Sequence, residues 1–192
     1  MIQAIILAAG ESKRMGFPKA LLEFDGKKAV EKILAACRGA GIQKPIVVLG
    51  AHAEEIQRKA ELCSAQVVLN ADWPKGQTSS VKTGVQELNR ATSWFLVWPV
   101  DLPLVPLDVL HQLLAATPEN SSKRILVPTY RGRRGHPVRF HVSLEEEILA
   151  LENEEPLHNL IRREPTRVQE VPVSSETVLR DFDRPEDVSP LF

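Results

Sequence analysis

The chain has few cysteines and no long apolar run, and each absence excludes a class of protein. Cys37 and Cys63 are its only cysteines, which are too few for a disulfide framework and lack the short spacing of a zinc site. We expect both to be small, buried hydrophobic side chains. No apolar run is long enough to span a bilayer, and the chain opens on a short apolar segment rather than on a basic stretch and a signal core. These features predict a cytoplasmic protein.

Net charge is also almost absent. Lysine and arginine number 24 against 25 aspartate and glutamate residues, for a formal net charge of -1. This balance provides no broad basic surface, so we expect neither nucleic acid nor a membrane as a partner. The expected partner is a small molecule. The sequence also lacks internal repeats and low-complexity linkers, and its 192 residues suit one α/β domain, which we assign to residues 1–192.

Short apolar runs alternate with segments of helical periodicity in the first half of the chain. Residues 1–7 form an isoleucine-rich run too short for a helix, which is typical of a strand buried on both faces. Residues 27–38 carry apolar side chains at helical spacing. The same alternation predicts strands at 45–50, 66–70 and 94–100, and helices at 53–62, 78–88 and 106–116. Such an order favours parallel strands with right-handed crossovers.

The second half departs from this order. Short strands are expected at 124–128 and 138–141, with a basic turn at 131–136 between them, so the sheet should contain a small antiparallel excursion. The strand expected at 167–173 contains Pro172, which cannot donate a hydrogen bond to a neighbouring strand and therefore indicates an edge. Helices are expected at 144–151 and 157–163.

The segment after the first strand must be compared with the known phosphate-binding loops. From Leu7 to Lys19 it reads L-A-A-G-E-S-K-R-M-G-F-P-K. It is not a Walker A loop, because Gly10 and Gly16 are one residue too far apart and phenylalanine follows where lysine is required. It is not a dinucleotide fingerprint, because Ser12 stands in the place of the second glycine.

What remains in this segment is a set of small residues followed by two cations. Ala8, Ala9 and Gly10 leave their backbone N–H groups uncovered, and Arg14 and Lys19 place positive charge beside whatever these groups hold. Open α/β sheets bind ligands at the carboxyl ends of their strands, which is where this loop lies. The combination predicts a triphosphate site.

Two acidic positions fit such a site. Asp101 follows the most apolar strand, at the same sheet edge as Gly10, where a carboxylate is well placed to hold Mg²⁺; the alternative is a turn-forming aspartate. Asp181 and Asp183 lie at alternate positions before a Pro-Glu pair, and on their own they are typical of a helix cap. If Asp183 returns to the sheet edge, it completes a two-carboxylate metal site.

Two further positions have both a functional and a simpler interpretation. Ser79 and Ser80 lie where a polar loop enters a helix, so they are candidates to receive an anion or a ribose, although such residues are also the usual helix caps. His136, in Gly-His-Pro after three nearby arginines, is a candidate acceptor or phosphate contact; a solvated basic loop is the alternative. The other four histidines show no ligand spacing.

The candidate segments occur together, in one order, in a known family. They are the segments 7–19, 76–84, 101–103, 135–137 and 181–187. On these motifs the chain resembles the MobA-like nucleotidyltransferases, most closely the cytidylyltransferase branch that uses CTP and molybdopterin. The resemblance runs from residue 1 to about residue 188 and implies a single three-layer α/β/α Rossmann-like domain with a mostly parallel sheet.

The resemblance implies a reaction as well as a fold. A terminal phosphate of the acceptor would attack the α-phosphorus of CTP and expel pyrophosphate, with Mg²⁺ as cofactor, and the catalytic residues would be Arg14, Lys19 and Asp101. Asp101 and Asp183 would coordinate the metal. The residues implied in nucleotide binding are Leu7, Ala8, Ala9, Gly10, Arg14, Lys19, Ser79 and Ser80, with His136 as a candidate acceptor contact.

An alternative remains open for the nucleotide donor, for the acceptor molecule and for whether the protein is a catalyst at all. The pair Ala8-Ala9 matches the cytidylyl branch, whereas guanylyl-transferring relatives usually carry Ala-Gly, so CTP is favoured over GTP. Residues 155–160 stand where family members often have Gly-Ala-Arg, which leaves another phosphate or a sugar phosphate open as acceptor. A non-catalytic protein that escorts a nucleotide or cofactor is the third alternative. Transient contact with a molybdoenzyme or its chaperone is an expected partnership.

Overall fold

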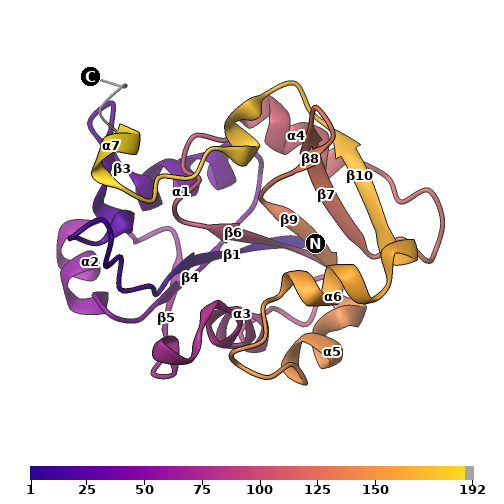
Figure 1. Cartoon of the computed structure of the whole chain (residues 1–192), viewed down its shortest axis with the longest axis horizontal. Coiled ribbons are helices and arrows are strands. Elements are labelled where there is room, and N and C mark those ends of the chain that lie inside the picture. The colour runs from indigo at the N-terminus through magenta and orange to yellow at the C-terminus, as the bar shows by residue number, and fades with distance from the viewer. Residues whose placement is uncertain (189–192) are drawn as a thin grey trace.

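A mostly parallel sheet forms the centre of the molecule, whose computed structural model describes residues 1–188 (Figure 1). The strand order is β10-β7-β9-β6-β1-β4-β5, and β8 pairs with β7. Its strands are β1 Ile2–Ala8, β4 Ile46–Leu49, β5 Gln66–Leu69, β6 Trp94–Pro99, β7 Ile125–Tyr130, β8 Arg133–Arg134, β9 Val138–His141 and β10 Val168–Pro172. A separate two-stranded sheet is formed by β2 Glu23–Phe24 and β3 Lys27–Lys28.

Helices cover both faces of the sheet. Helices α1, α2 and α4 pack on one face, and α3, α5 and α6 pack on the other. The α-helices are α1 Ala29–Gly39, α2 Ala53–Lys59, α3 Gln77–Gln86, α4 Leu107–Ala115, α5 Glu145–Leu149, α6 His158–Arg163 and α7 Pro185–Val188. The 3-10 helices are η1 Lys19–Leu21, η2 Trp73–Lys75, η3 Val142–Leu144, η4 Pro165–Arg167 and η5 Glu176–Leu179. The predicted three-layer, Rossmann-like architecture is confirmed.

The central strands have apolar side chains on both faces because both faces are covered. In β1, Ala4 and Ile6 belong to the core under α1 and α4, while Ile5 and Leu7 belong to the core under α3. Helix α3 lies especially close to β1, since a Cβ atom at Gly84 would be only 2.3 Å from Ile5 Cγ2. The absence of a side chain at this position therefore sets the height of α3 above the sheet.

The antiparallel excursion and the edge position of the last strand are confirmed. Strand β9 runs antiparallel to both β6 and β7, and among the strands of residues 1–188 β10, which contains Pro172, pairs only with β7. Three local predictions are wrong. Residues 27–28, predicted to begin a helix, form a strand because Asp25 and Gly26 adopt positive φ and make a hairpin turn. The helix predicted at 53–62 ends at Lys59. Cys63, which we expected to be buried, is exposed. Cys37 is buried as expected, and burial raises its pKa to about 12.

Parallel pairing of β1 with β6 brings the candidate segments to one edge. Leu7 lies opposite Pro99, so the loop after β1 and the segment after β6 leave the sheet side by side. Residues 173–184, which we call the strap, cross this same edge. The Phe182 N–H donates to the Asp101 carbonyl over 3.0 Å, and the fully buried Phe182 ring packs edge-on against Phe24. The strap is thereby fixed to the tip of β6.

A buried arginine joins the sheet to the end of α4. Arg139, on β9, is 6% exposed, and its guanidinium donates hydrogen bonds to the carbonyls of Leu113, Leu114 and Ala116 over 2.9 to 3.1 Å. It also lies over the Trp94 ring, 4.4 Å from the centroid. A cation at a helix C-terminus satisfies the last carbonyls and opposes the negative end of the helix dipole.

We expect Arg139→Ala to lower the free energy of unfolding by about 2–4 kcal/mol, because one buried and two partly buried carbonyls lose their donor. Urea denaturation measures the change. The matched control is Arg124→Ala, in which an exposed arginine is truncated and a change within about 0.5 kcal/mol is expected. Equal destabilisation by the two substitutions would contradict a capping role for Arg139.

Candidate active site

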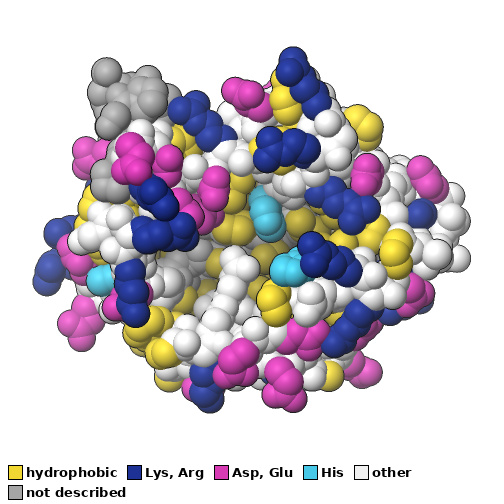
Figure 2. Space-filling view, viewed as in Figure 1, with side chains coloured by type: hydrophobic (Ala, Val, Ile, Leu, Met, Phe, Trp, Pro, Cys, Tyr) yellow, Lys and Arg dark blue, Asp and Glu magenta, His cyan; other side chains and the backbone are white. Residues whose placement is uncertain are grey.

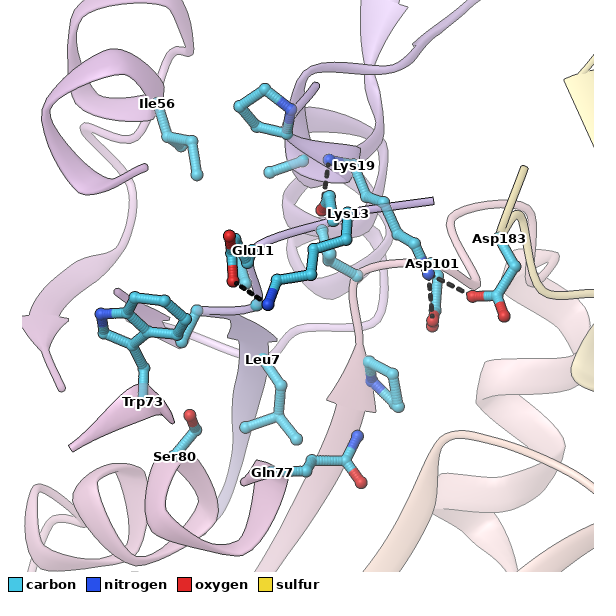
Figure 3. A pocket seen from close by; sticks show the side chains of 18 of the residues that line it. Leu7, Glu11, Lys13, Lys19, Ile56, Trp73, Gln77, Ser80, Asp101 and Asp183 are labelled. Atoms are coloured by element: carbon cyan, nitrogen blue, oxygen red, sulfur yellow. Dashed lines mark hydrogen bonds and ion pairs between the residues drawn. The ribbon is translucent and has the colours of Figure 1, made fainter. Parts of the chain in front are cut away.

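A cavity of about 390 Å³ opens at the carboxyl ends of β1 and β6 (Figure 3). Its walls come from four parts of the chain: the loop after β1, the segment from η2 to the start of α3, the tip of β6, and the strap. The predicted residues that line this first cavity are Leu7, Ala8, Ala9, Gly10, Arg14, Lys19, Ser80, Asp101 and Asp183. The structure thus brings together residues from both ends of the chain.

The loop after β1 is held in shape from within. Ala8 and Ala9 are buried in the cores on opposite faces of the sheet, so they present mainly backbone to the cavity. Ser12 adopts a positive φ of 55°, and its hydroxyl accepts a hydrogen bond from the Lys19 N–H over 3.1 Å. Met15 is buried and anchors the loop to the core. This frame leaves the side chains of Arg14 and Lys19 directed along the edge of the sheet.

Lys19 and Arg14 meet the two predicted carboxylates (Figure 3 shows those around Lys19). The Lys19 ammonium lies 3.3 Å from Asp101 Oδ2 and also contacts Asp183 Oδ1, while the Arg14 guanidinium is 2.6 Å from Asp183 Oδ2. The hydrogen bond from Lys19 lowers the pKa of Asp183. Although burial disfavours the charged ammonium, contact with the two carboxylates raises the pKa of Lys19. These contacts therefore favour the charged forms of Lys19 and Asp183.

At Asp101, burial disfavours the charged carboxylate more than the neighbouring cation favours it. Loss of hydration raises its pKa, and the attraction of Lys19 offsets that effect only in part. Its Oδ1 atom is buried and has no hydrogen-bond partner within residues 1–188. An unpartnered carboxylate oxygen beside a second carboxylate suits a divalent cation. Mg²⁺ in particular binds through one or two carboxylates and completes its shell with phosphate oxygens and water.

The described residues offer few side-chain ligands for a metal ion. Within the described residues no group of three or more histidine, cysteine, aspartate or glutamate side chains is arranged to hold a metal ion. Asp101 and Asp183 therefore fit a cation that a substrate helps to bind, rather than one that the protein encloses on its own.

The two predicted serines at the start of α3 differ in position. Buried Asn70 donates to both hydroxyls, at 2.8 Å to Ser79 and 3.0 Å to Ser80. The Ser79 hydroxyl also lies within hydrogen-bond distance of the Asp72 and Gly76 carbonyls, so it fixes the turn before α3 and does not line the cavity. Ser80 lines the cavity. Ser79 thus has a structural role, but it is not a helix cap, because the N-cap of α3 is Gly76, which supplies no side-chain cap. The ligand-contact prediction remains for Ser80.

His136 also lies outside the first cavity. It lines a second cavity of about 360 Å³, which shares Gln77 and Pro99 with the first. Burial lowers the pKa of His136, and its Nδ1 atom has no partner within the described part of the chain. The backbone N–H of His136 donates a hydrogen bond to the carbonyl of Val178, on the strap, over 2.9 Å. The basic segment before it is partly a strand, β8, rather than a turn throughout.

Among the residues of the first cavity that sequence reasoning missed, Trp73 and Gln77 carry large side chains on its walls. Trp73, in η2, forms one side wall, and Gln77, the first residue of α3, extends along the floor (Figure 3). A tryptophan in a polar loop was a usable signal, because exposed aromatic side chains in loops are often binding surfaces. Gln77 carried no such signal, since nothing in its sequence neighbourhood distinguishes it from a helix-capping glutamine.

No helix in residues 1–188 combines the length and apolar character that crossing a bilayer requires.

Comparison with protein families matches residues 4–169 to the MobA-like NTP transferase domain. The match spans the loop after β1, both serines and Asp101, and it ends before the strap.

Individual relatives extend the comparison. Nicotine blue oxidoreductase of Paenarthrobacter nicotinovorans is 29% identical over 97% of this chain and 94% of its own length. A probable molybdenum cofactor guanylyltransferase of Bacillus cereus (strain Q1) is 30% identical over 79% of this chain and 74% of its own. The crystal structure of Rv0371c from Mycobacterium tuberculosis H37Rv superposes with a TM-score of 0.88 at 25% identity, over 99% of this chain and 96% of that one.

The cavity, its paired carboxylates and the family match agree with one another. The match covers well over half of the chain, and it includes the strands that carry the loop and Asp101. The chain belongs to the MobA-like NTP transferase family and is an enzyme of the nucleotidyltransferase class.

Proposed function

We propose that the protein transfers the CMP group of CTP to a terminal phosphate of a molybdopterin-type acceptor, with Mg²⁺ as cofactor and release of pyrophosphate. The observation that carries this proposal is the cluster at the carboxyl edge of β1 and β6. Two cationic side chains, Arg14 and Lys19, meet two carboxylates, Asp101 and Asp183, beside a loop that presents its backbone. This is the charge pattern that a metal-bound triphosphate requires.

The reaction requires the protein to position its two substrates and to stabilise charge on the phosphates, and it does not require a strong base. An oxygen of the acceptor phosphate forms a bond to the α-phosphorus, and the bond from that phosphorus to the β-phosphate bridging oxygen breaks. Arg14 and Lys19 neutralise the charge that accumulates on the departing pyrophosphate. Asp101 and Asp183 would hold Mg²⁺, which supplies Lewis-acid polarisation of phosphate oxygens when bound. Ser80 and the loop after β1 orient the nucleotide.

CTP is proposed over GTP on the residue pair Ala8-Ala9, which matches the cytidylyl branch of the family. The name of the Bacillus cereus relative favours GTP instead. Both nucleotides are therefore tested, with the other two NTPs as controls for base selection.

Hydride transfer is the competing reaction, because one relative is named an oxidoreductase. Two features argue against it in this chain. The loop after β1 has Ser12 where the dinucleotide fingerprint needs its second glycine, and the Ser12 hydroxyl already accepts a hydrogen bond from the Lys19 N–H. A nicotinamide dinucleotide also has no need of two carboxylates around a lysine, whereas a metal-bound triphosphate does.

The first test is a pyrophosphate-release screen of the four NTPs with molybdopterin and with sugar phosphates as acceptors. We expect acceptor-dependent release with CTP and molybdopterin to exceed that with any other pair by about tenfold or more. A preference for GTP would correct the donor, and a preference for a sugar phosphate would correct the acceptor. Nucleotide binding without release would identify an escort protein, and oxidation of NADH or NADPH with no release would replace the proposal by hydride transfer.

Asp101→Asn is expected to lower Mg²⁺-dependent turnover by at least about 100-fold, because it removes one metal carboxylate and keeps the shape of the side chain. Burial disfavours the charged carboxylate, so the ligand-free variant should be as stable as the parent protein or slightly more stable. Turnover and the thermal midpoint are measured together. Asp181→Asn is the control, since Asp181 is an exposed carboxylate on the strap, which crosses the same sheet edge as Asp101. Full activity of Asp101→Asn, or its unfolding, would exclude the metal role.

The adjacent serines give a second matched pair. Ser80→Ala should weaken CTP binding in calorimetry by about 3- to 10-fold and should destabilise the protein less than Ser79→Ala, because its hydroxyl lies at the cavity and bonds only Asn70 within residues 1–188. Ser79→Ala should lower the free energy of unfolding by about 1–3 kcal/mol, because buried Asn70 and two carbonyls of the turn before α3 lose a hydrogen-bond partner. If Ser79→Ala weakened CTP binding while Ser80→Ala did not, our assignment of the two serines would be reversed.

A further inference from the structure

A third cavity, of about 360 Å³, lies at the other end of β6 from the candidate active site. It opens where β6 and β7 begin and β9 ends, beside residues 116–124, which connect α4 to β7. Trp94, the first residue of β6, lines this cavity, whereas Pro99, the last residue, lines the first cavity. The strand between them is about 17 Å long. A ligand in the third cavity would therefore be separate from one in the candidate active site.

The lining of the third cavity is basic. Over the face shown in Figure 2, basic and acidic side chains are intermixed, as the net charge of -1 implies. Among the described residues that line the third cavity, by contrast, Lys123 and Arg124 are cationic and none is acidic. Neither of these two side chains forms an ion pair within residues 1–188, where Glu147 and Glu164 pair with Arg167 instead. Two adjacent cations without a counterion suit an anionic ligand.

Hydrogen bonds hold this basic lining in place and leave donors unused. The Lys123 ammonium has three hydrogens and donates to the Val168 carbonyl over 2.8 Å, which leaves two for a ligand. The Arg124 backbone is tied on both sides, because its N–H donates to the Arg167 carbonyl over 2.9 Å and its carbonyl accepts the His141 N–H over 2.8 Å. The guanidinium of Arg124 is exposed and takes no part in these backbone contacts.

His141 adds a neutral donor. Its Nδ1 atom accepts a hydrogen bond from the Ser143 N–H over 3.2 Å, so the proton of the neutral ring lies on Nε2. Burial, together with the charges of Arg124 and Arg139, lowers the pKa of His141. The uncharged form is thereby favoured, and this ring contributes an N–H group to the lining rather than a third full charge.

An indole ring forms the apolar part of the lining. The Arg139 guanidinium lies over the Trp94 ring, 4.4 Å from its centroid, and the His141 ring meets Trp94 edge-on with 4.8 Å between centroids. Trp94 is only half buried, and it lines the cavity. A tryptophan ring held from two sides offers a fixed surface on which a flat ring of a ligand can stack.

We propose that the third cavity binds a phosphomonoester that carries a planar ring, with its phosphate at Lys123 and Arg124 and its ring against Trp94. A phosphomonoester carries close to two negative charges at neutral pH and several acceptor oxygens, which match two cations and the nearby N–H donors better than a carboxylate does. Such a ligand takes no part in nucleotidyl transfer, because the reacting groups lie at the other end of β6.

The binding test uses AMP as the probe and fluorine NMR of the protein labelled with 5-fluorotryptophan. The three tryptophans report on separate places: Trp94 on the third cavity, Trp73 on the first, and fully buried Trp98 on the core as a reference. We expect AMP to shift the Trp94 signal in a saturable way. Adenosine lacks the phosphate and ribose 5-phosphate lacks the ring, so each should bind at least about tenfold more weakly.

Arg124→Ala should weaken the AMP binding that Trp94 reports by about 10- to 100-fold, because a charge-assisted contact is lost. Its fold should be intact, since the packing contacts of Arg124 with Arg167 and His141 are made by its backbone. Arg90→Ala is the matched control with unchanged affinity, because Arg90 is an exposed arginine just before β6 that does not line the cavity.

Three results would overturn the assignment of the third cavity. The first is an AMP-induced shift of the Trp73 signal without one of Trp94, which would place the probe in the first cavity. The second is equal AMP affinity in Arg124→Ala and the parent protein. The third is binding of adenosine or of ribose 5-phosphate as tight as that of AMP. No NTP and no acceptor takes part in these measurements, so a failure of the proposed nucleotidyl transfer would leave their outcome unchanged.

Discussion

The parallel pairing of β1 with β6 is the constraint on which the rest of the site depends. Because Leu7 lies opposite Pro99, the loop after β1 and Asp101 emerge at one edge and at one height. The pairing is held by apolar side chains on both faces of the two strands, which makes a change of register costly. The proposed chemistry therefore sits beside the buried central strands, and the loops need only carry the reactive groups a short distance from them.

The charges at this edge require one another. Two carboxylates so close together repel, and Lys19 lies between them while Arg14 contacts the outer one. These are also the cations proposed to meet a triphosphate. The protein thus balances its own carboxylates with cations, and a metal-nucleotide complex, which brings both a cation and an anion, would exchange with these contacts without a large change in net charge.

Local patterns in the sequence predicted the parts of the fold and site that depend on neighbouring residues. The strand-loop unit from Leu7 to Lys19 and the position of Asp101 follow from strand ends and sheet polarity alone. Asp183 was predicted only conditionally, because nothing near it in the sequence shows that residues 173–184 return to the tip of β6. Ser79 and Ser80 could not be distinguished, since their roles depend on the rotational phase of α3. The second cavity was not predicted, because antiparallel β9 and the segment before α6 assemble it from distant stretches.

The strap has a consequence for the order in which the protein is made. Asp183 is separated by 164 positions from Lys19 and by 82 from Asp101, and the buried Phe182 ring fixes it beside them. A growing chain can complete the pairing of β1, β4 and β6 long before this carboxylate has been synthesised. Such a nascent chain would hold the loop and Asp101 but only half of the proposed cation-binding pair. Synthesis of the strap therefore determines when the candidate active site is complete.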